Sequence, residues 1–208
     1  MSTQNIFDKL SREAFRAGIN PRTKESRKWF RQRAKDLRDI KPRQLLQQAP
    51  LEQGDERIIG SMQMFFYDPK TKATLPYYDK FPLVVVVQPA PKGFYGLNLH
   101  YLPPVLRAKM LDSLMGVATS KKSANAKFEI TYQRLKGMSE MKYFKPCFKH
   151  YLTSHVRSQF ATVPAPEWEI ATFLPVAQFE KIPNPLTAYK DSRAILAGIS
   201  TKVGGTLD

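Results

Sequence analysis

The sequence predicts an α+β fold: a small antiparallel β-barrel, SH3-like or OB-like, with inserted helices and a basic N-terminal helical arm. Two patterns support this prediction. Apolar residues alternate with other residues in short runs between residues 62 and 101, as they do in strands. Before and after these runs, apolar residues recur at helical spacing. Tight turns join the strand-like runs, so we expect an antiparallel meander that rolls into a barrel.

The basic helical arm is expected to span residues 1–50. These residues include 13 Lys or Arg but only 5 Asp or Glu. One helical stripe consists of Ile6, Phe7, Leu10 and Ala14, and a second of Phe30, Ala34, Leu37 and Ile40. Between the stripes, Gly18 is expected to end the first helix and Asn20 to cap the second. Pro42 is expected to end or kink the second helix.

The barrel-like core domain is expected to span residues 51–180. Its strands are predicted near residues 62–67, 81–88 and 95–101. Four consecutive valines in the second strand imply that both of its faces are buried.

After the third strand, the sequence predicts a helix from about Val105 to Val117. Residues 144–156 also fit helical spacing best. Alternation over residues 168–176 predicts a strand, which Pro175 places at an edge of the sheet. Residues 181–208 contain Pro, Gly and Lys at short intervals and are predicted to form an extended C-terminal tail.

Basic residues dominate the composition. The chain has 33 Lys and Arg against 18 Asp and Glu, which gives a formal net charge of +15 and an isoelectric point near 9.9. The 42% hydrophobic content excludes a wholly disordered basic tail. A surface this positive attracts polyanions: nucleic acid, an anionic membrane or an acidic protein. The same charge also suits a basic subunit that its neighbours neutralise in an assembly.

Membrane insertion and export are not expected. The longest uninterrupted apolar run covers residues 83–87, far below the ~20 residues of a membrane span. The N-terminus lacks the basic-then-apolar order of a signal peptide. The single cysteine, Cys147, excludes an internal disulfide. We therefore expect a soluble intracellular protein, or one packed into a particle made there, with no membrane partner.

The sequence offers little catalytic chemistry. Neither a GxxxxGK[ST] phosphate loop nor a GxGxxG turn occurs in it. Cys147, His150 and His155 supply three possible metal ligands, whereas a structural zinc site needs four. The acidic residues do not show the clustering of a metal-dependent nuclease. We therefore expect no enzyme activity, no cofactor and no metal site.

Polyanion binding is the chemistry that the sequence supports. The candidate contact residues are Arg27, Lys28, Trp29, Arg31, Arg33, Lys35 and Arg38 in the arm, with Lys121 and Lys122 beyond it. Each Lys or Arg can neutralise one phosphate. Trp29 and Phe30 either stack on an exposed base or a frayed end, or anchor the helix to the barrel. Nothing resembles a base-reading helix-turn-helix or zinc finger, so DNA binding is expected to be sequence-independent.

Five segments carry a resemblance to a known family. They are residues 65–70 (FFYDPK), 75–83 (LPYYDKFPL), 93–103 (GFYGLNLHYLP), 143–152 (YFKPCFKHYL) and 168–175 (WEIATFLP). In this order they resemble structural proteins of contractile-tailed phages, and are most similar to the DNA end protectors of T-even-like phages. The resemblance covers roughly residues 10 to 195.

The resemblance implies a virion protein that is assembled in the host cytoplasm. Such a protein caps the ends of packaged DNA, shields them from host exonuclease and helps the filled head to join the tail. The family contributes no catalytic residues. The implied partners are other virion proteins of the portal, neck, tail or baseplate, together with DNA, in a multi-copy assembly.

The sequence therefore leaves two main hypotheses for the function of the chain. In the first, the arm binds DNA or its end. In the second, the chain is a purely structural neck, tail or baseplate component whose basic arms bind acidic neighbouring subunits. A phage enzyme is a third hypothesis, and it requires a histidine or carboxylate cluster that converges in a pocket.

Overall fold

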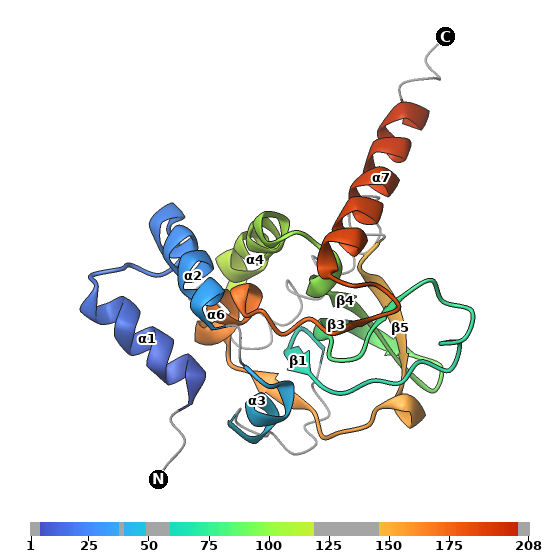
Figure 1. Ribbon diagram of the computed structural model, residues 1–208, viewed down its shortest axis with the longest axis horizontal. Helices are drawn as coiled ribbons and strands as arrows, with labels where there is room; N and C mark the ends of the chain where they lie inside the picture. The colour runs from blue at the N-terminus through green and yellow to red at the C-terminus, as the bar shows by residue number, and fades with distance from the viewer. Residues whose placement is uncertain (1–4, 38–39, 49–58, 119–145, 204–208) are drawn as a thin grey trace.

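The computed structural model describes residues 5–37, 40–48, 59–118 and 146–203. In this part of the chain, helices pack against a five-stranded antiparallel sheet (Figure 1). In spatial order the strands are β5 (Phe148–Leu152), β4 (Gly93–Asn98), β3 (Leu83–Ala90), β1 (Met62–Met64) and β6 (Ala161–Val163). A separate antiparallel pair joins β2 (Tyr78–Asp79) to β7 (Phe179–Glu180).

The sheet is open, so the predicted closed barrel is not confirmed. β5 and β6 form its two edges, and they do not pair with each other within the described strands. Closure requires strands that continue a regular tilt and stagger around a common axis. Since β1 and β6 have only three residues each, they are too short to carry that stagger round to β5. The large core lies between the sheet and the helices (Figure 1).

The three predicted strands are confirmed with shorter or shifted bounds, as β1, β3 and β4. β1 pairs with β3 on one side and with β6 on the other, so a strand from late in the chain extends the meander. Gly96 is required in β4 because a Cβ atom there would lie 2.2 Å from Val84 Cγ1 and 3.2 Å from the carbonyl oxygen of Val85.

Both faces of β3 are buried, as the four valines predicted. Val85 and Val87 belong to the large core, which also holds the buried apolar side chains of the helices. Val84 and Val86 face the opposite side of the sheet. There they pack in a smaller cluster with Phe65, Tyr67, Phe94 and Tyr151.

The predicted arm helices and the helix after the third strand are confirmed. They are α1 (Ile6–Arg16), α2 (Lys24–Asp36) and α4 (Pro104–Ala118). Gly18 follows α1 with a φ of +68°, a left-handed conformation that glycine adopts readily. Thr23, rather than Asn20, caps α2. Pro42 opens a further helix, α3 (Pro42–Gln48), and does not end α2, which has already closed at Leu37.

The helix predicted over residues 144–156 is wrong where the structure describes it. Residues 148–152 form β5, and residues 153–155 form the short 3₁₀ helix η3 (Thr153–His155). Pairing with β4 places Tyr151 opposite Phe94 and His150 opposite Tyr95. The aromatic contacts across this ladder stabilise the strand, and they are formed with residues about fifty positions away, so local spacing does not indicate them.

The strand predicted over residues 168–176 is also wrong. Residues 168–173 form α6 (Trp168–Phe173), which follows the 3₁₀ helix η4 (Ala165–Glu167). All six residues of α6 are buried, so the segment has no exposed side from which its period can be recognised. Pro175 lies beyond the end of α6, where it does not interrupt the helix.

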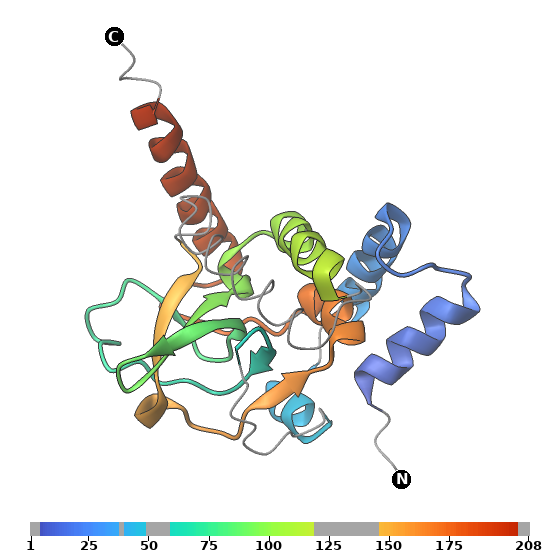
Figure 2. The same cartoon turned by 180° about the vertical axis from the view of Figure 1, so that it is seen from behind.

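The extended tail predicted for residues 181–208 is corrected by helix α7 (Pro185–Val203). Pro185 occupies the first helical position, and the Asn184 side chain accepts a hydrogen bond from the Leu186 N–H group at 2.9 Å. The start of α7 is attached to the body through buried Ala188 and through Ser192, whose hydroxyl donates to the carbonyl oxygen of Tyr101 at 2.9 Å. The rest of α7 projects away from the body (Figures 1 and 2).

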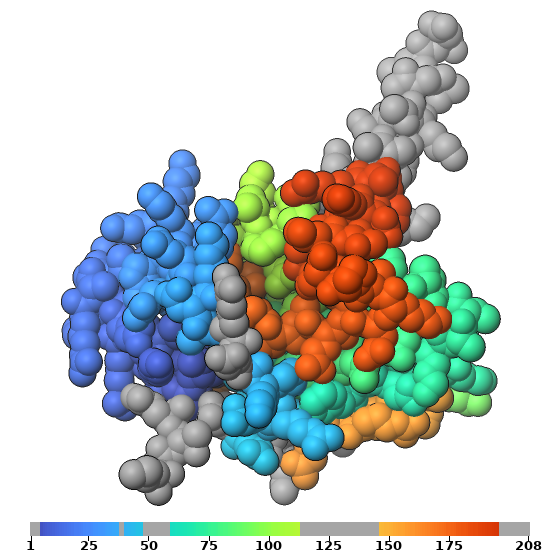
Figure 3. All heavy atoms as spheres, in the orientation of Figure 1, coloured from blue at the N-terminus to red at the C-terminus, as the bar shows by residue number. Residues whose placement is uncertain are grey.

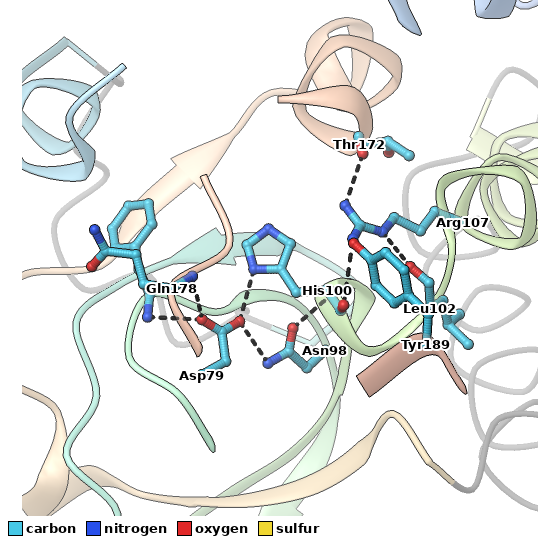
Figure 4. Close-up of polar contacts among 9 residues, drawn as sticks. Asp79, Asn98, His100, Leu102, Arg107, Thr172, Gln178 and Tyr189 are labelled. Atoms are coloured by element: carbon cyan, nitrogen blue, oxygen red, sulfur yellow. Dashed lines mark hydrogen bonds and ion pairs between the residues drawn. The ribbon is translucent and has the colours of Figure 1, made fainter. Parts of the chain in front are cut away.

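A buried polar network centred on Asp79 connects the segments around the sheet (Figure 4). One Asp79 oxygen accepts hydrogen bonds from the backbone N–H groups of Phe81 at 3.0 Å and Gln178 at 3.2 Å. The other oxygen accepts from the Asn98 side-chain amide at 3.2 Å and from His100 Nδ1 at 2.7 Å. Asp79, Asn98 and His100 are almost fully buried. The carboxylate therefore holds the β2 turn, η1 (Leu99–Tyr101) and the start of β7 together.

Arg107 of α4 extends the network to the helices (Figure 4). Its buried guanidinium donates to the carbonyl oxygens of Leu102 at 2.7 Å, Thr172 at 3.1 Å and His100 at 3.4 Å, and to the Tyr189 hydroxyl at 2.5 Å. These acceptors lie in η1 and the residue after it, in α6 and in α7. One side chain thus fixes the positions of α4, α6 and α7 relative to the sheet.

Replacing Asp79 with alanine is expected to destabilise the fold strongly. The change leaves four donors without their acceptor in a site closed to water. We expect the free energy of unfolding to fall by about 3–5 kcal/mol, as measured by urea denaturation. Asp68→Ala is the control, because Asp68 also precedes a turn but forms partly exposed ion pairs with Lys72 and Arg157. Equal losses of unfolding free energy in the two variants would show that the buried network does not depend on Asp79.

Stability is expected to fall below about pH 6.5 because of His100. Burial lowers the pKa of His100 from its ordinary 6.5, and the nearby Asp79 carboxylate offsets only part of this effect. The unfolded chain therefore binds a proton at His100 more readily than the folded protein does. The contribution of neutral His100 to the free energy of unfolding is complete above about pH 6.5 and is lost as the pH falls below that value. Wild type is expected to lose more stability between about pH 7.5 and about pH 5.5 than His100→Gln. Exposed His150→Gln is the control and is expected to follow wild type.

Candidate nucleic-acid interface

Helices α1 and α2 form one end of the molecule and lie side by side in both views (Figures 1 and 2). They are docked rather than free. Phe7, Leu10 and Ala14 of α1 belong to the large core, as do Phe30 and Ala34 of α2. The charged residues of both helices are therefore carried on a fixed support. The two helices form the outer surface at this end of the molecule (Figure 3).

Glu169 of α6 anchors the turn between these two helices. Its buried carboxylate accepts a hydrogen bond from the backbone N–H group of Arg22 at 2.8 Å and from the Ser26 hydroxyl at 2.7 Å. Arg22 has a φ of +63°, a left-handed conformation that is unfavourable for a residue with a side chain. The negative charge also lies at the N-terminus of α2, where the helix dipole favours it. Glu169 thus fixes where α2 begins.

α2 presents a stripe of four cations, which we call the α2 stripe. It consists of Lys24, Lys28, Arg31 and Lys35, all exposed. Their spacing of four, three and four residues places them on one side of the helix, along about 16 Å of its axis. The buried residues of α2 lie on a different side. The stripe therefore faces solvent.

α1 carries a second stripe, which we call the α1 stripe. It consists of Lys9, Arg12 and Arg16, which are exposed. Their spacing of three and four residues again places them on one side of the helix, away from Phe7, Leu10 and Ala14. The sequence does not single out these three residues, because the cations of α2 are more densely clustered.

The structure divides the predicted contact residues into two groups. Lys28, Arg31 and Lys35 belong to the α2 stripe. Arg27 instead pairs with Asp112 of α4. Arg33 pairs with Glu13 of α1 through two nitrogens, at 2.5 and 3.1 Å. Arg27 and Arg33 therefore hold α2 against its neighbours, whereas the stripe residues face outward. Arg38, Lys121 and Lys122 lie outside the described residues.

Trp29 and Phe30 anchor α2 rather than projecting from it. Phe30 is buried in the core, and Trp29 is half-buried with its ring centroid 5.0 Å from that of Phe30. The Arg33 guanidinium lies 5.7 Å from the Trp29 ring centroid. Trp29 also lines a groove of about 560 Å³ between α1 and α2, together with Glu13, Arg16, Ala17, Gln32, Arg33 and Asp36. Phe30 and Arg33 thus contact part of the ring, and another part lines the groove.

The candidate metal ligands serve other contacts. Cys147 is buried, and burial raises the pKa of its thiol to about 12. His150 Nε2 lies 3.1 Å from the carbonyl oxygen of Pro91, and His155 Nδ1 lies 2.8 Å from that of Asp68. Across residues 5–37, 40–48, 59–118 and 146–203, no group of three or more His, Cys, Asp or Glu is placed to hold a metal ion.

Comparison with known proteins identifies the family. The family model of the phage T4 terminal DNA protecting protein matches residues 3–191. The chain belongs to this family. The resemblance to phage DNA end protectors is thereby confirmed. No curated protein and no solved structure matches the chain. No helix in the described part of the chain is both long and apolar enough to cross a membrane.

Replacing Glu169 with glutamine is expected to loosen the attachment of α2. The amide presents only one oxygen and carries no charge, so at least one of the two hydrogen bonds is broken or weakened. We expect the free energy of local opening of α1 and α2 to fall by about 1.5–3 kcal/mol, as measured by amide hydrogen exchange. Glu25→Gln, which removes an exposed charge in the first turn of α2, is the matched control. Equal exchange in the two variants would show that Glu169 does not anchor the turn.

Proposed function

We propose that this phage protein binds the ends of packaged duplex DNA through the α1 and α2 stripes, independently of sequence and without a catalytic step. The α2 stripe is the observation on which this proposal rests. Its four cations are exposed along one side of a helix whose buried side is fixed to the core. Membership of a terminal DNA protecting family supports DNA as the polyanion.

The geometry of the stripe suits a phosphate backbone. Lys24 and Lys28 are separated by about 6 Å along the helix axis, as are Arg31 and Lys35. Because Glu169 and the core hold α2 in place, binding does not require the helix to become ordered first. Phosphate contacts position a protein on DNA but carry no sequence information. Binding through the stripes is therefore expected to be sequence-independent.

Within the virion, we propose that the protein sits where filled heads join tails and contacts other virion proteins there. Helix α7 favours such contacts, because Leu186 near its start and Ile195 further along are exposed apolar residues. The same observation favours the second candidate function, a structural connector that uses its basic helices to bind acidic neighbouring subunits. The two functions differ in whether isolated DNA is bound.

The test compares DNA binding by two variants of equal charge. In the first, Lys24, Lys28, Arg31 and Lys35 are replaced by glutamine. In the second, exposed Lys70, Lys92, Lys190 and Arg193 are replaced by glutamine. Affinity for linear duplex DNA is measured at several salt concentrations. We expect the stripe variant to bind more weakly and its log–log salt slope to fall by about 0.9 for each phosphate that the variant no longer neutralises.

The control variant is expected to stay close to wild type. Equal reductions in the two variants would mean general attraction between a basic protein and DNA rather than a defined interface. Failure of wild type to bind DNA at moderate salt would contradict the proposal and favour the connector.

A further inference from the structure

Phe15 is the most exposed large apolar side chain in the described part of the chain. Its exposed fraction is 84%, against 61% for Leu186 and 53% for Val105. It lies in the last turn of α1 and outside the core-facing positions Leu10 and Ala14. The fold therefore does not require an aromatic ring at this position.

Two arginines lie near this ring on α1. Arg12 precedes Phe15 by three residues, which places the two side chains next to each other on the helix surface, and Arg16 follows it directly. Both arginines belong to the exposed α1 stripe. After Arg16 the chain turns through Gly18, and a Cβ atom placed there would meet nothing within 4 Å. Phe15 is thus an exposed ring with Arg12 beside it on the helix surface, next to an open turn.

We infer that Phe15 stacks on the terminal base pair of duplex DNA while Arg12 and Arg16 contact the phosphates nearest the end. This inference rests on the proposed function and adds the residue that distinguishes an end from the interior. Every internal base pair is stacked on both faces, so only a terminus offers a flat aromatic surface to a side chain. Cations beside the ring match the phosphates that surround this surface.

Trp29 is less suited than Phe15 to stack on a terminal base pair. Its ring packs against Phe30 and the Arg33 guanidinium, and it faces the groove between α1 and α2. Phe15 has a far more exposed ring on a helix that is already fixed to the core. The sequence left open whether Trp29 and Phe30 stack on a base or anchor the helix. Both rings pack against the protein, and Phe15 is the exposed aromatic beside an arginine.

The experiment compares two duplexes of the same sequence. One has a blunt end and a hairpin loop, and the other is closed by hairpin loops at both ends. Dissociation constants are measured for wild type, Phe15→Ala, Phe15→Trp and the control Leu186→Ala, which also truncates an exposed apolar side chain. A 2-aminopurine at the terminal pair reports stacking by its fluorescence.

We expect wild type to prefer the blunt-ended duplex. Phe15→Ala is expected to bind it about 5- to 150-fold more weakly, which corresponds to one base–aromatic stack, with unchanged affinity for the closed duplex. Phe15→Trp is expected to keep the preference, and Leu186→Ala to behave as wild type. The terminal fluorescence change is expected to disappear in Phe15→Ala.

Two results separate this inference from the proposed function. If Phe15→Ala keeps the end preference, the inference is wrong although end binding by the stripes stands. If wild type binds both duplexes equally, the inference and the end preference of the proposed function are both wrong, and only general DNA binding stands. If wild type binds neither duplex, both are wrong. Weaker binding to another virion protein in Phe15→Ala, with DNA binding intact, would assign the ring to a protein interface and overturn the inference.

Discussion

The buried Asp79 carboxylate is the constraint on which the arrangement of the helices depends. It fixes His100, whose carbonyl oxygen accepts a hydrogen bond from Arg107. Arg107 in turn binds the carbonyl oxygen of Thr172 in α6, and Glu169 of the same helix holds the turn before α2. A continuous set of hydrogen bonds thus runs from the sheet to the helix that carries the α2 stripe. The proposed interface is positioned by the core.

This arrangement explains how a strongly basic chain holds defined cations at fixed positions on its exposed surface. A flexible basic arm attracts DNA, but it loses conformational entropy on binding. Here Arg27 and Arg33 form ion pairs with Asp112 and Glu13 that help to attach α2, while the stripe residues remain exposed on the outside. Whether a cation of α2 attaches the helix or faces solvent depends on its position around the helix.

Sequence patterns predicted the parts of the fold that depend on local periodicity, such as α1, α2, α4 and β3. They failed for residues 148–152 and 168–173, because pairing with β4 and complete burial override the local period. The division of the chain at residues 50 and 180 stays a prediction. Of the candidate site, sequence indicated the charge of α2 but not its anchor, since Glu169 lies more than 140 positions from its partners. The exposure of Phe15 likewise follows from packing rather than from composition.

The central claim is that the docked α1–α2 pair contacts a DNA terminus. The most direct measurement is photo-crosslinking to a duplex that carries a photoreactive base either at its terminal pair or at its centre, followed by peptide mapping. We expect terminal crosslinks to map to residues 9–35 and to exceed central crosslinks at the same protein concentration. Crosslinks that map elsewhere on the chain, or that form equally from both positions, would contradict the account.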